Sequence, residues 1–455
     1  MKKNVAGNTS LFDYEGKPSL AKSIPLGIQH VLAMIVGNVT PSIMVAAATG
    51  MTMDERTLLV QTGLLIAGIA TFMQLFAFKQ IGARLPVIMG ISFSYIPVLL
   101  AIGSEYGIAA IFGAQLIGSL AAVIMGFFIK PIRKYFPPIV AGTVVLTIGL
   151  SLYPIGVNYM AGGIGSPTYG SLLNWLVAII VLATVLICNN YGKGIFKLAS
   201  ILVGILAGYL LALPLGMVDF TPLASADWVA LPKPFHFGIE FYPTAAISMV
   251  VMYVVNAIQS VGDFSSTTVG GFNREVTDAE LAGGIKSYGL SSAIASMIGA
   301  LPTATYSQNV GIVASTKVVA RRVFAIAASI VIVAGLIPKF GAFMTTIPYA
   351  VLGGATISVF GMITMTGIKL ITQEEMSNRN MSIVGLSVAL GMGITQVPAA
   401  LANFPDWFMM VFGRSPVVIA TLMALFLNVV IPKKSLEEEQ KERESLDEQE
   451  LIKSS

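Results

Sequence analysis

The adjacent side-chain amides of Gln308 and Asn309 are the residues of this sequence best suited to recognise a small molecule. They begin the segment Gln308 to Lys317, in a chain that is otherwise mostly apolar. An amide offers an acceptor oxygen and an NH2 donor, so the pair can match a ligand that presents donors and acceptors along one edge. The alternative is that the amides only hold a broken stretch of backbone together.

The elements that must position this pair are membrane spans. The 455 residues are 55% hydrophobic and 11% charged, with a mean hydropathy of +0.81, which excludes a soluble domain of this length. Apolar runs of roughly 18 to 25 residues recur from about Ile24 to Ile431, each long enough to cross about 30 Å of hydrocarbon. We count fourteen such runs. The first continues as a helix through Pro41 without a cleavage site, so we expect a span and not a signal peptide.

The distribution of Lys and Arg predicts the orientation of the chain in the plasma membrane. If the N-terminus is cytoplasmic, the loops on the opposite side hold only Arg56, Lys233, Lys339 and Arg414. This asymmetry favours two cytoplasmic termini and an even number of crossings. The net charge of +4 then reflects topology and indicates no nucleic-acid partner. The single cysteine, Cys188, excludes a disulfide framework.

The two halves of the chain repeat each other weakly. Residues 136–142 match residues 347–353 with Pro, Val and Gly identical, at an offset of 211, and Leu85-Pro86 matches Leu301-Pro302 at an offset of 216. Seven crossings per half is an odd number, so the second half must enter the membrane from the other face. The pattern predicts the inverted repeat of a secondary transporter.

The segments that follow the two Leu-Pro pairs predict a binding site at the membrane midplane. Residues 89–94 and 303–308 are short and carry small or polar residues where an ordinary span would be Leu and Val. Paired interrupted segments at corresponding places in two halves are typical of transporter sites. Their extended backbone is tolerated only where protein or a water-filled cavity surrounds it. We expect half-helices from near Tyr95 and near Val310, with their positive ends toward the cavity.

The segment Gln308-Asn309-x-Gly311-x4-Thr316-Lys317 resembles the signature of the nucleobase-ascorbate transporter family, also called the nucleobase-cation symporter-2 family. Within the family it is most similar to the signature of bacterial xanthine and uric acid permeases. The resemblance runs from about Gly27 to Pro432. Further agreements are Gln29-His30, Ser92-Phe93, Phe136-Pro137-Pro138 with Gly142-Thr143, Ser260-Val261-Gly262-Asp263, and Leu281-Ala282-Gly283-Gly284.

The resemblance implies an all-α polytopic membrane protein with 14 transmembrane segments in a 7+7 inverted repeat. The repeats would occupy residues 24–218 and 243–432, joined by an external linker of residues 219–242. Residues 1–23 would be a cytoplasmic N-terminal tail and residues 433–455 a charged cytoplasmic tail. Spans 1–4 and 8–11 would form a core domain, spans 5–7 and 12–14 a gate domain. Spans 3 and 10 would be short and interrupted, and the protein would be a homodimer.

The resemblance also implies which residues bind the substrate. A Gln-Asn head of the signature accompanies oxidised purines such as xanthine and uric acid, so Gln308 and Asn309 would bind the base, although Asn309 has a structural alternative. Phe93 would stack on the base or serve only as packing. The remaining expected site residues are Ser92, Gln259 and Gly311 for binding, and Thr316 and Lys317 for specificity or for closing the half-helix.

Two departures from the family pattern bear on energy coupling. Relatives carry Glu where this chain has Gln259, and often Asp where it has Tyr288. An amide keeps a hydrogen bond but cannot titrate, so a proton route through position 259 is closed. Asp263 is then the acidic residue expected well inside a span, either as the coupling site or as a structural anchor for the signature half-helix. His30 is expected to be structural or to handle protons, and Tyr288 to belong with Asp263 and His30 to a coupling or core hydrogen-bond network.

These observations predict a proton-coupled importer of purine nucleobases in the lipid bilayer, with no cofactor, no metal and no catalytic residues. The alternative is an uncoupled transporter, one coupled to another cation, or one that carries uracil or another purine. A channel or a non-transporting sensor is a further alternative, and so is an anion transporter of the sulfate type, which shares the repeat architecture. An enzyme is disfavoured because no nucleophile-base constellation is present.

Overall fold

The computed structural model describes residues 9–133, 135–433, 436–438 and 440–441. Within these residues the chain forms two compact units. Unit 1 contains the segments up to Lys130 and from Leu152 to Phe360, and unit 2 contains Pro131–Ser151 and the chain from Gly361 onward. Residues 1–8 of the expected N-terminal tail and most of the expected tail of residues 433–455 lie outside the described residues.

Unit 1 is helical apart from one small sheet. Its elements are α1 (Leu20–Ala48), α2 (Met53–Leu75), β1 (Met89–Ile91), η1 (Phe93–Tyr95), α3 (Ile96–Tyr106), α4 (Ile108–Phe127), α7 (Leu172–Tyr191), α8 (Ile195–Leu198), α9 (Ser200–Ala212), α10 (Thr221–Ser225), α11 (Pro243–Phe272), α12 (Asp278–Ile298), β2 (Thr303–Thr305), α13 (Ser307–Thr316), α14 (Arg321–Gly335) and α15 (Pro338–Thr345). Helices α5 (Ile129–Arg133), α6 (Pro138–Met160) and α16 (Tyr349–Ile371) each cross the boundary between the units. Unit 2 adds α17 (Asn378–Gln396), η2 (Pro398–Leu401), α18 (Asp406–Phe408), η3 (Met409–Gly413) and α19 (Pro416–Val430).

Local sequence explains where several long helices begin. In α2 the hydroxyl of Thr52 accepts from the backbone N–H of Glu55, whose carboxylate accepts in return from the backbone N–H of Thr52. Thr277 and Glu280 form the same reciprocal cap at the start of α12. Such a cap satisfies backbone donors that a helix leaves unpaired. Helix α1 continues through Pro41 as predicted.

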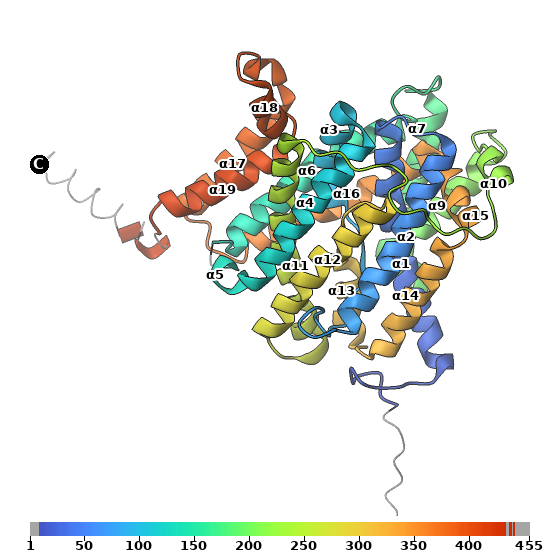
Figure 1. Cartoon of the computed structure of the whole chain (residues 1–455), viewed down its shortest axis with the longest axis horizontal. Helices are drawn as coiled ribbons and strands as arrows, with labels where there is room; N and C mark the ends of the chain where they lie inside the picture. The colour runs from blue at the N-terminus through green and yellow to red at the C-terminus, as the bar shows by residue number, and fades with distance from the viewer. Residues whose placement is uncertain (1–8, 134, 434–435, 439, 442–455) are drawn as a thin grey trace, which may run out of the picture. The chain divides into compact units, whose positions relative to one another are not determined.

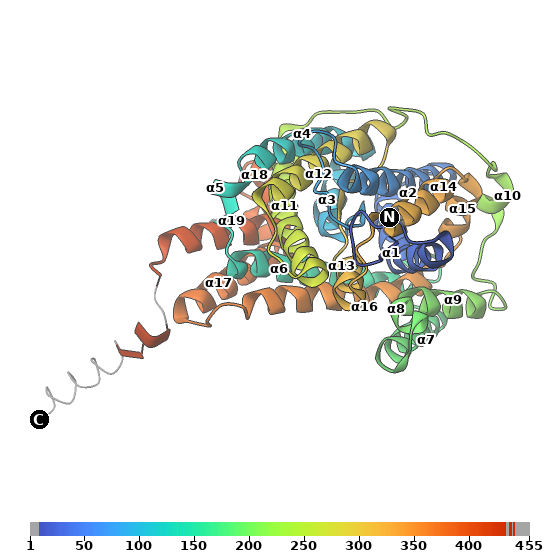
Figure 2. The same ribbon diagram turned by 90° about the horizontal axis from the view of Figure 1, so that it is seen from below.

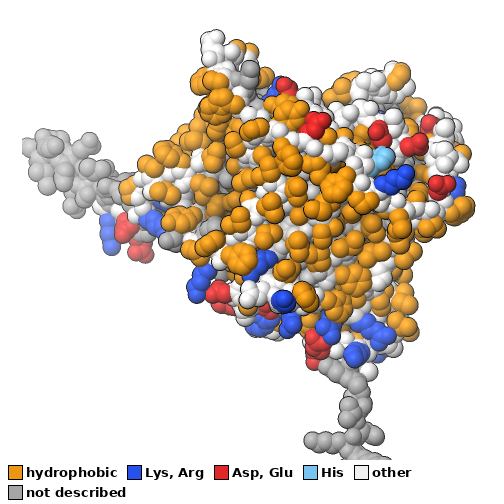
Figure 3. Space-filling view, viewed as in Figure 1, with side chains coloured by type: hydrophobic (Ala, Val, Ile, Leu, Met, Phe, Trp, Pro, Cys, Tyr) orange, Lys and Arg blue, Asp and Glu red, His pale blue; other side chains and the backbone are white. Residues whose placement is uncertain are grey.

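Seven helices of the described chain are long and apolar enough to cross a membrane, and the pair α14 and α15, bent by 82°, would make an eighth. Helices α9 and α19 are also apolar but shorter. Hydrophobic side chains cover most of the visible face of unit 1 (Figure 3). On α4, for example, Leu120, Ile124 and Phe127 are each more than half exposed. This surface suits lipid, because a helix satisfies its own backbone hydrogen bonds.

Close helix packing holds unit 1 together. Helix α14 lies beside α1 and α2, and α4 lies beside α11 and α12 (Figures 1 and 2). Small residues allow the helices to approach. At Gly289 of α12, an added Cβ would lie 2.7 Å from the carbonyl oxygen of Ser119 and 2.7 Å from the backbone nitrogen of Val123 on α4. Packing through small residues is the usual way in which membrane helices associate.

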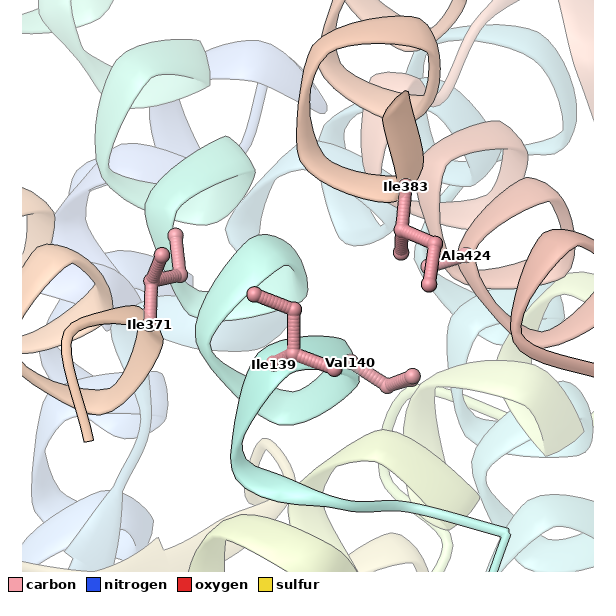
Figure 4. Close-up of a cluster of buried hydrophobic side chains, with 5 residues drawn as sticks. All are labelled: Ile139, Val140, Ile371, Ile383 and Ala424. Atoms are coloured by element: carbon pink, nitrogen blue, oxygen red, sulfur yellow. The ribbon is translucent and has the colours of Figure 1, made fainter. Parts of the chain in front are cut away.

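Unit 2 has its own hydrophobic cluster and a buried arginine. The Arg379 guanidinium donates to the carbonyl oxygen of Ile431 at 3.0 Å and to that of Asn428 at 2.7 Å, so it links α17 to the end of α19. These bonds satisfy a charge that burial would otherwise destabilise. The buried residues of the cluster are Ile139, Val140, Ile371, Ile383 and Ala424 (Figure 4).

Helix α16 contains a matched pair of glycines for a stability test. A Cβ at Gly353 would lie 2.2 Å from the backbone nitrogen of Met160, whereas a Cβ at Gly361 would meet nothing within 4 Å. We expect Gly353→Ala to lower the free energy of unfolding by about 1 to 3 kcal/mol, because rigid backbone must move. Gly361→Ala should leave stability unchanged or raise it. The melting temperatures of the two purified variants in detergent check this, and equal values would contradict it.

Candidate functional site

The two interrupted segments meet as an antiparallel pair of strands inside unit 1. Met89, Gly90 and Ile91 of β1 pair with Thr305, Ala304 and Thr303 of β2, and all six residues are buried. Two further backbone bonds extend the contact, from the N–H of Tyr306 to Ile88 and from the N–H of Ser92 to Pro302. The pairing satisfies backbone groups that no helix satisfies at this point. It also places the start of α3 and the start of α13 next to the same sheet.

The second half-helix begins earlier than the sequence predicted. Helix α13 starts at Ser307 and not near Val310, because the N–H groups of Asn309 and Val310 both donate to the carbonyl oxygen of Tyr306. Gln308 and Asn309 therefore lie in its first turn. Helix α3 starts at Ile96 after the short turn η1, one residue from the expected Tyr95.

Asp263 of α11 connects to this junction from the side. Its Oδ1 accepts from the hydroxyl of Ser307 at 2.8 Å, and its Oδ2 accepts from the hydroxyl of Thr305. The carboxylate is buried, and both donors flank the point where β2 becomes α13. The sequence did not single out Thr305 and Ser307, although their hydroxyls in a short polar run were the available signal.

Asn309 lies on the inner side of α13, against α1. Its Nδ2 donates to the carbonyl oxygen of His30 at 3.0 Å and lies 3.0 Å from the His30 Nδ1. Asn309 is 1% exposed and His30 2% exposed, and the His30 ring contacts Phe324. This arrangement agrees with a structural role for both residues.

Gln308 and Gln259 carry amides on a more open side. Gln308 is partly exposed, and its side chain forms no hydrogen bond with another residue of the described chain. Gln259 of α11 accepts from the Ser94 hydroxyl at 3.2 Å through Oε1. Its NH2 group therefore stays available to a ligand. Asp263 lies one turn after Gln259 on α11 and accepts a hydrogen bond from Ser307, the residue before Gln308. The amides of Gln259 and Gln308 therefore lie on adjacent segments.

Two glycines mark open space beside these amides. Gly262 lies three residues after Gln259, and Gly311 lies three residues after Gln308, so each shares a helix face with its amide. Both glycines are exposed, and an added Cβ at either would meet nothing within 4 Å. We call Gln259, Gly262, Gln308 and Gly311 the amide face. It combines donors, acceptors and room for a ligand.

Phe93 and Ser92 stand at the edge of the other half-helix. The Phe93 ring is 7% exposed and contacts Phe360 edge to face, with 5.3 Å between ring centroids. Ser92 is partly exposed, and its hydroxyl accepts from the backbone N–H of Ser94 at 3.1 Å. Phe93 therefore packs against Phe360, and Ser92 caps the start of η1.

Within the described residues, Tyr288 forms no hydrogen bond with Asp263 or His30, with which it was expected to share a coupling or core hydrogen-bond network. Its hydroxyl bonds to that of Tyr95, and it lies 3.4 Å from the carbonyl oxygen of Tyr253. All three tyrosines are fully buried between α3, α11 and α12. The contact between the Tyr288 and Tyr95 hydroxyls links α12 to η1.

Thr316 and Lys317 close α13. Lys317 takes a left-handed backbone conformation, with φ 59°, and its N–H donates to Val313. Its ammonium group donates to the carbonyl oxygen of Gly270 at 2.5 Å, and the Thr316 hydroxyl donates to Ile312. No group of three or more His, Cys, Asp or Glu that could hold a metal occurs in the described residues.

The comparisons with known proteins agree on one family. The family model Xan_ur_permease, described as a permease family, matches residues 21–400. The chain belongs to this family. It is 38% identical to a putative purine permease of Clostridium perfringens (95% of this chain, 96% of the relative) and 35% identical to the xanthine permease of Bacillus subtilis (90% and 93%). The xanthine permease XanQ of Escherichia coli is 32% identical (94% and 95%).

Solved structures support the fold of this permease. The transmembrane domain of the cyanobacterial bicarbonate transporter BicA matches with a TM-score of 0.57 and 15% identity, over 90% of this chain and 98% of that chain. Murine Slc26a9, an anion transporter, matches with a TM-score of 0.63 and 9% identity, over 92% and 69%. The family model and the sequence relatives confirm the family resemblance, so the protein is a membrane permease and not an enzyme.

The two signature amides should differ in their effect on stability. We expect Asn309→Ala to lower the free energy of unfolding by about 1 to 3 kcal/mol, because buried polar groups of His30 lose their partner. Gln308→Ala should change it by less than about 0.5 kcal/mol, since a partly exposed side chain without partners is removed. Thermal unfolding of both purified variants without ligand measures the contrast, and a larger loss in Gln308→Ala would contradict it.

Proposed function

We propose that the protein is a secondary active transporter that imports purine nucleobases such as xanthine or uric acid. The observation that carries the proposal is the amide face, where Gln259 and Gln308 stand beside open space. An amide can pair with an adjacent N–H and C=O of an oxopurine in two hydrogen bonds. A base without that edge would leave a polar group unpaired, at a cost of about 1 to 3 kcal/mol. The names of the relatives, which include xanthine and purine permeases, support the same substrate class.

The proposed architecture has fourteen spans in two inverted repeats of seven. The short elements β1 with α3 and β2 with α13 would be spans three and ten, and both termini would face the cytoplasm of a plasma-membrane protein. A core domain of spans 1–4 and 8–11 moves against a gate domain of spans 5–7 and 12–14 to alternate access. The protein works as a homodimer. The antiparallel pairing of β1 with β2 supports two oppositely inserted halves.

Transport is coupled to protons, with Asp263 as the titrating group. Gln259 stands where the family carries a carboxylate. Asp263, one turn away on the same helix, is the buried acid nearest to the amide face. One charge moving through about 100 mV supplies roughly 2.3 kcal/mol, enough for about fifty-fold accumulation of a neutral base. The second candidate is an uncoupled transporter, or one coupled to another cation, which the loss of a titratable group at position 259 favours.

Recognition by Gln308 is tested by ligand-induced stabilisation. Xanthine or urate should raise the melting temperature of the unaltered protein, because a ligand that binds only the folded form stabilises it by mass action. We expect Gln308→Ala to remove most of this shift. Gln396→Ala, which removes an exposed amide at the end of α17, should keep it. Equal shifts in both variants for every base tested would refute the proposed recognition.

Coupling is tested in proteoliposomes with an imposed pH gradient. The unaltered protein should accumulate labelled xanthine or urate, and a protonophore should abolish the accumulation. Asp263→Asn should lose gradient-driven accumulation but keep exchange of labelled for unlabelled base, since exchange needs no net proton movement. Uptake that only equilibrates the base and ignores the gradient would favour the uncoupled alternative, and Gln259→Glu should then introduce a pH dependence.

A further inference from the structure

Unit 1 contains a cavity whose lining differs from the amide face. Its volume is about 410 Å³, within the range of small-molecule sites. Its lining includes Ile43 of α1, Arg56 of α2 and Tyr349 at the start of α16. Residues from the segment 162–174, which ends in the first turn of α7, and from the segment 215–219 after α9 complete it. None of the four residues of the amide face lines it. It lies toward the C-terminal end of α1, which is the external side in the proposed orientation.

Arg56 supplies an unused cationic donor to this cavity. Its Nε donates to the carbonyl oxygen of Met51 at 3.1 Å, and its Nη1 donates to the hydroxyl of Tyr349 at 3.0 Å. These bonds fix the plane of the guanidinium group. Its Nη2 has no hydrogen-bond partner among the described residues, so two N–H groups remain for a ligand.

Asp219 supplies an acceptor in the same cavity. Its Oδ1 accepts from the hydroxyl of Thr221 at 2.6 Å and from the backbone N–H of Thr221 at 2.9 Å. The side-chain hydrogen bond and then the backbone bond lower the pKa of this carboxyl, so the group stays ionised at neutral pH. Its other oxygen can accept from a ligand N–H.

Specific contacts shape part of the lining of this cavity. Asn174 is 3% exposed, and its Nδ2 donates to the carbonyl oxygens of Ala161 at 3.0 Å and Thr168 at 2.7 Å. Gly162 has φ 108°, and a Cβ there would lie 2.1 Å from that Nδ2, so this position requires glycine. The rings of Tyr159 and Tyr349 pack with 4.9 Å between centroids. The cavity is therefore built by specific contacts.

We infer that this cavity is an outer binding site in which Arg56 captures an anionic oxopurine before it reaches the amide face. A cation and a carboxylate in one cavity suit a heterocycle that presents both acceptor oxygens and N–H donors. Asp219 repels any anion, but an oxopurine anion can offset this repulsion by donating N–H groups to the carboxylate, which an inorganic anion without N–H groups cannot do. The inference rests on the proposed function, because its ligand is the proposed substrate.

Uptake into cells expressing the full chain tests the inference with two bases. Urate carries a negative charge at neutral pH, whereas hypoxanthine is neutral. We expect Arg56→Gln to raise KM for urate about tenfold, with kcat changed less than twofold, because an attractive charge raises local substrate concentration. KM for hypoxanthine should change less than twofold. Arg56→Lys should restore most of the urate affinity. Bicarbonate in excess should not inhibit urate uptake.

The control is Lys233→Gln, which removes an exposed positive charge from the linker outside the cavity. It should leave both KM values unchanged. If Arg56→Gln transports urate normally, or loses urate and hypoxanthine uptake equally, the outer site is wrong while the proposed function stands. If the unaltered protein transports no nucleobase, the proposed function and the outer site both fail. Inhibition of urate uptake by bicarbonate would overturn the assignment to an oxopurine.

Discussion

Backbone groups that no helix satisfies are the constraint on which the centre of this permease depends. In a membrane interior, an unpaired N–H or C=O costs several kcal/mol, so extended backbone needs partners within the protein. Strands β1 and β2 provide them for each other. The remaining donors of β1 bond to side chains, Ile91 N–H to Asn38 at 2.7 Å and Met89 N–H to Thr71 at 3.0 Å. The Tyr306 hydroxyl donates to the carbonyl oxygen of Ile91 at 2.6 Å.

The pairing of β1 with β2 determines which side chains become neighbours at the candidate site. Two strands that cross antiparallel bring the ends of two half-helices to one place, so side chains more than 200 residues apart in sequence become neighbours. The amide face depends on this proximity. Helix α11 hydrogen-bonds to η1 through Ser94 and to α13 through Ser307. Gly90 is needed for the same contact, since an added Cβ would lie 2.3 Å from the Tyr306 ring.

Much of this arrangement was predictable from the sequence, and the features that were not depend on contacts outside their own local segment. Composition and the interrupted segments predicted membrane helices and extended breaks, because hydropathy and Pro or polar residues act locally. The start of α13 at Ser307 depends on Tyr306, which β2 holds extended, and a local pattern does not show this. The contacts of Asn309 with His30 and of Tyr288 with Tyr95 join residues 279 and 193 positions apart. Such contacts follow from packing, and a single sequence contains no signal for them.

Asp263 links the proposed coupling to this architecture. As a carboxylate it accepts hydrogen bonds from Thr305 and Ser307, the residues on either side of the junction between β2 and α13. A protonated carboxyl has one acceptor site fewer and gains a donor. Protonation would then turn one of these hydroxyls from donor into acceptor, so that its own proton needs a new acceptor and the hydrogen bonds at the junction immediately before Gln308 rearrange. A proton at Asp263 and a base at Gln308 would thus act on the same turn of backbone. This gives the two ligands a physical route to affect each other's binding without a carboxylate at position 259.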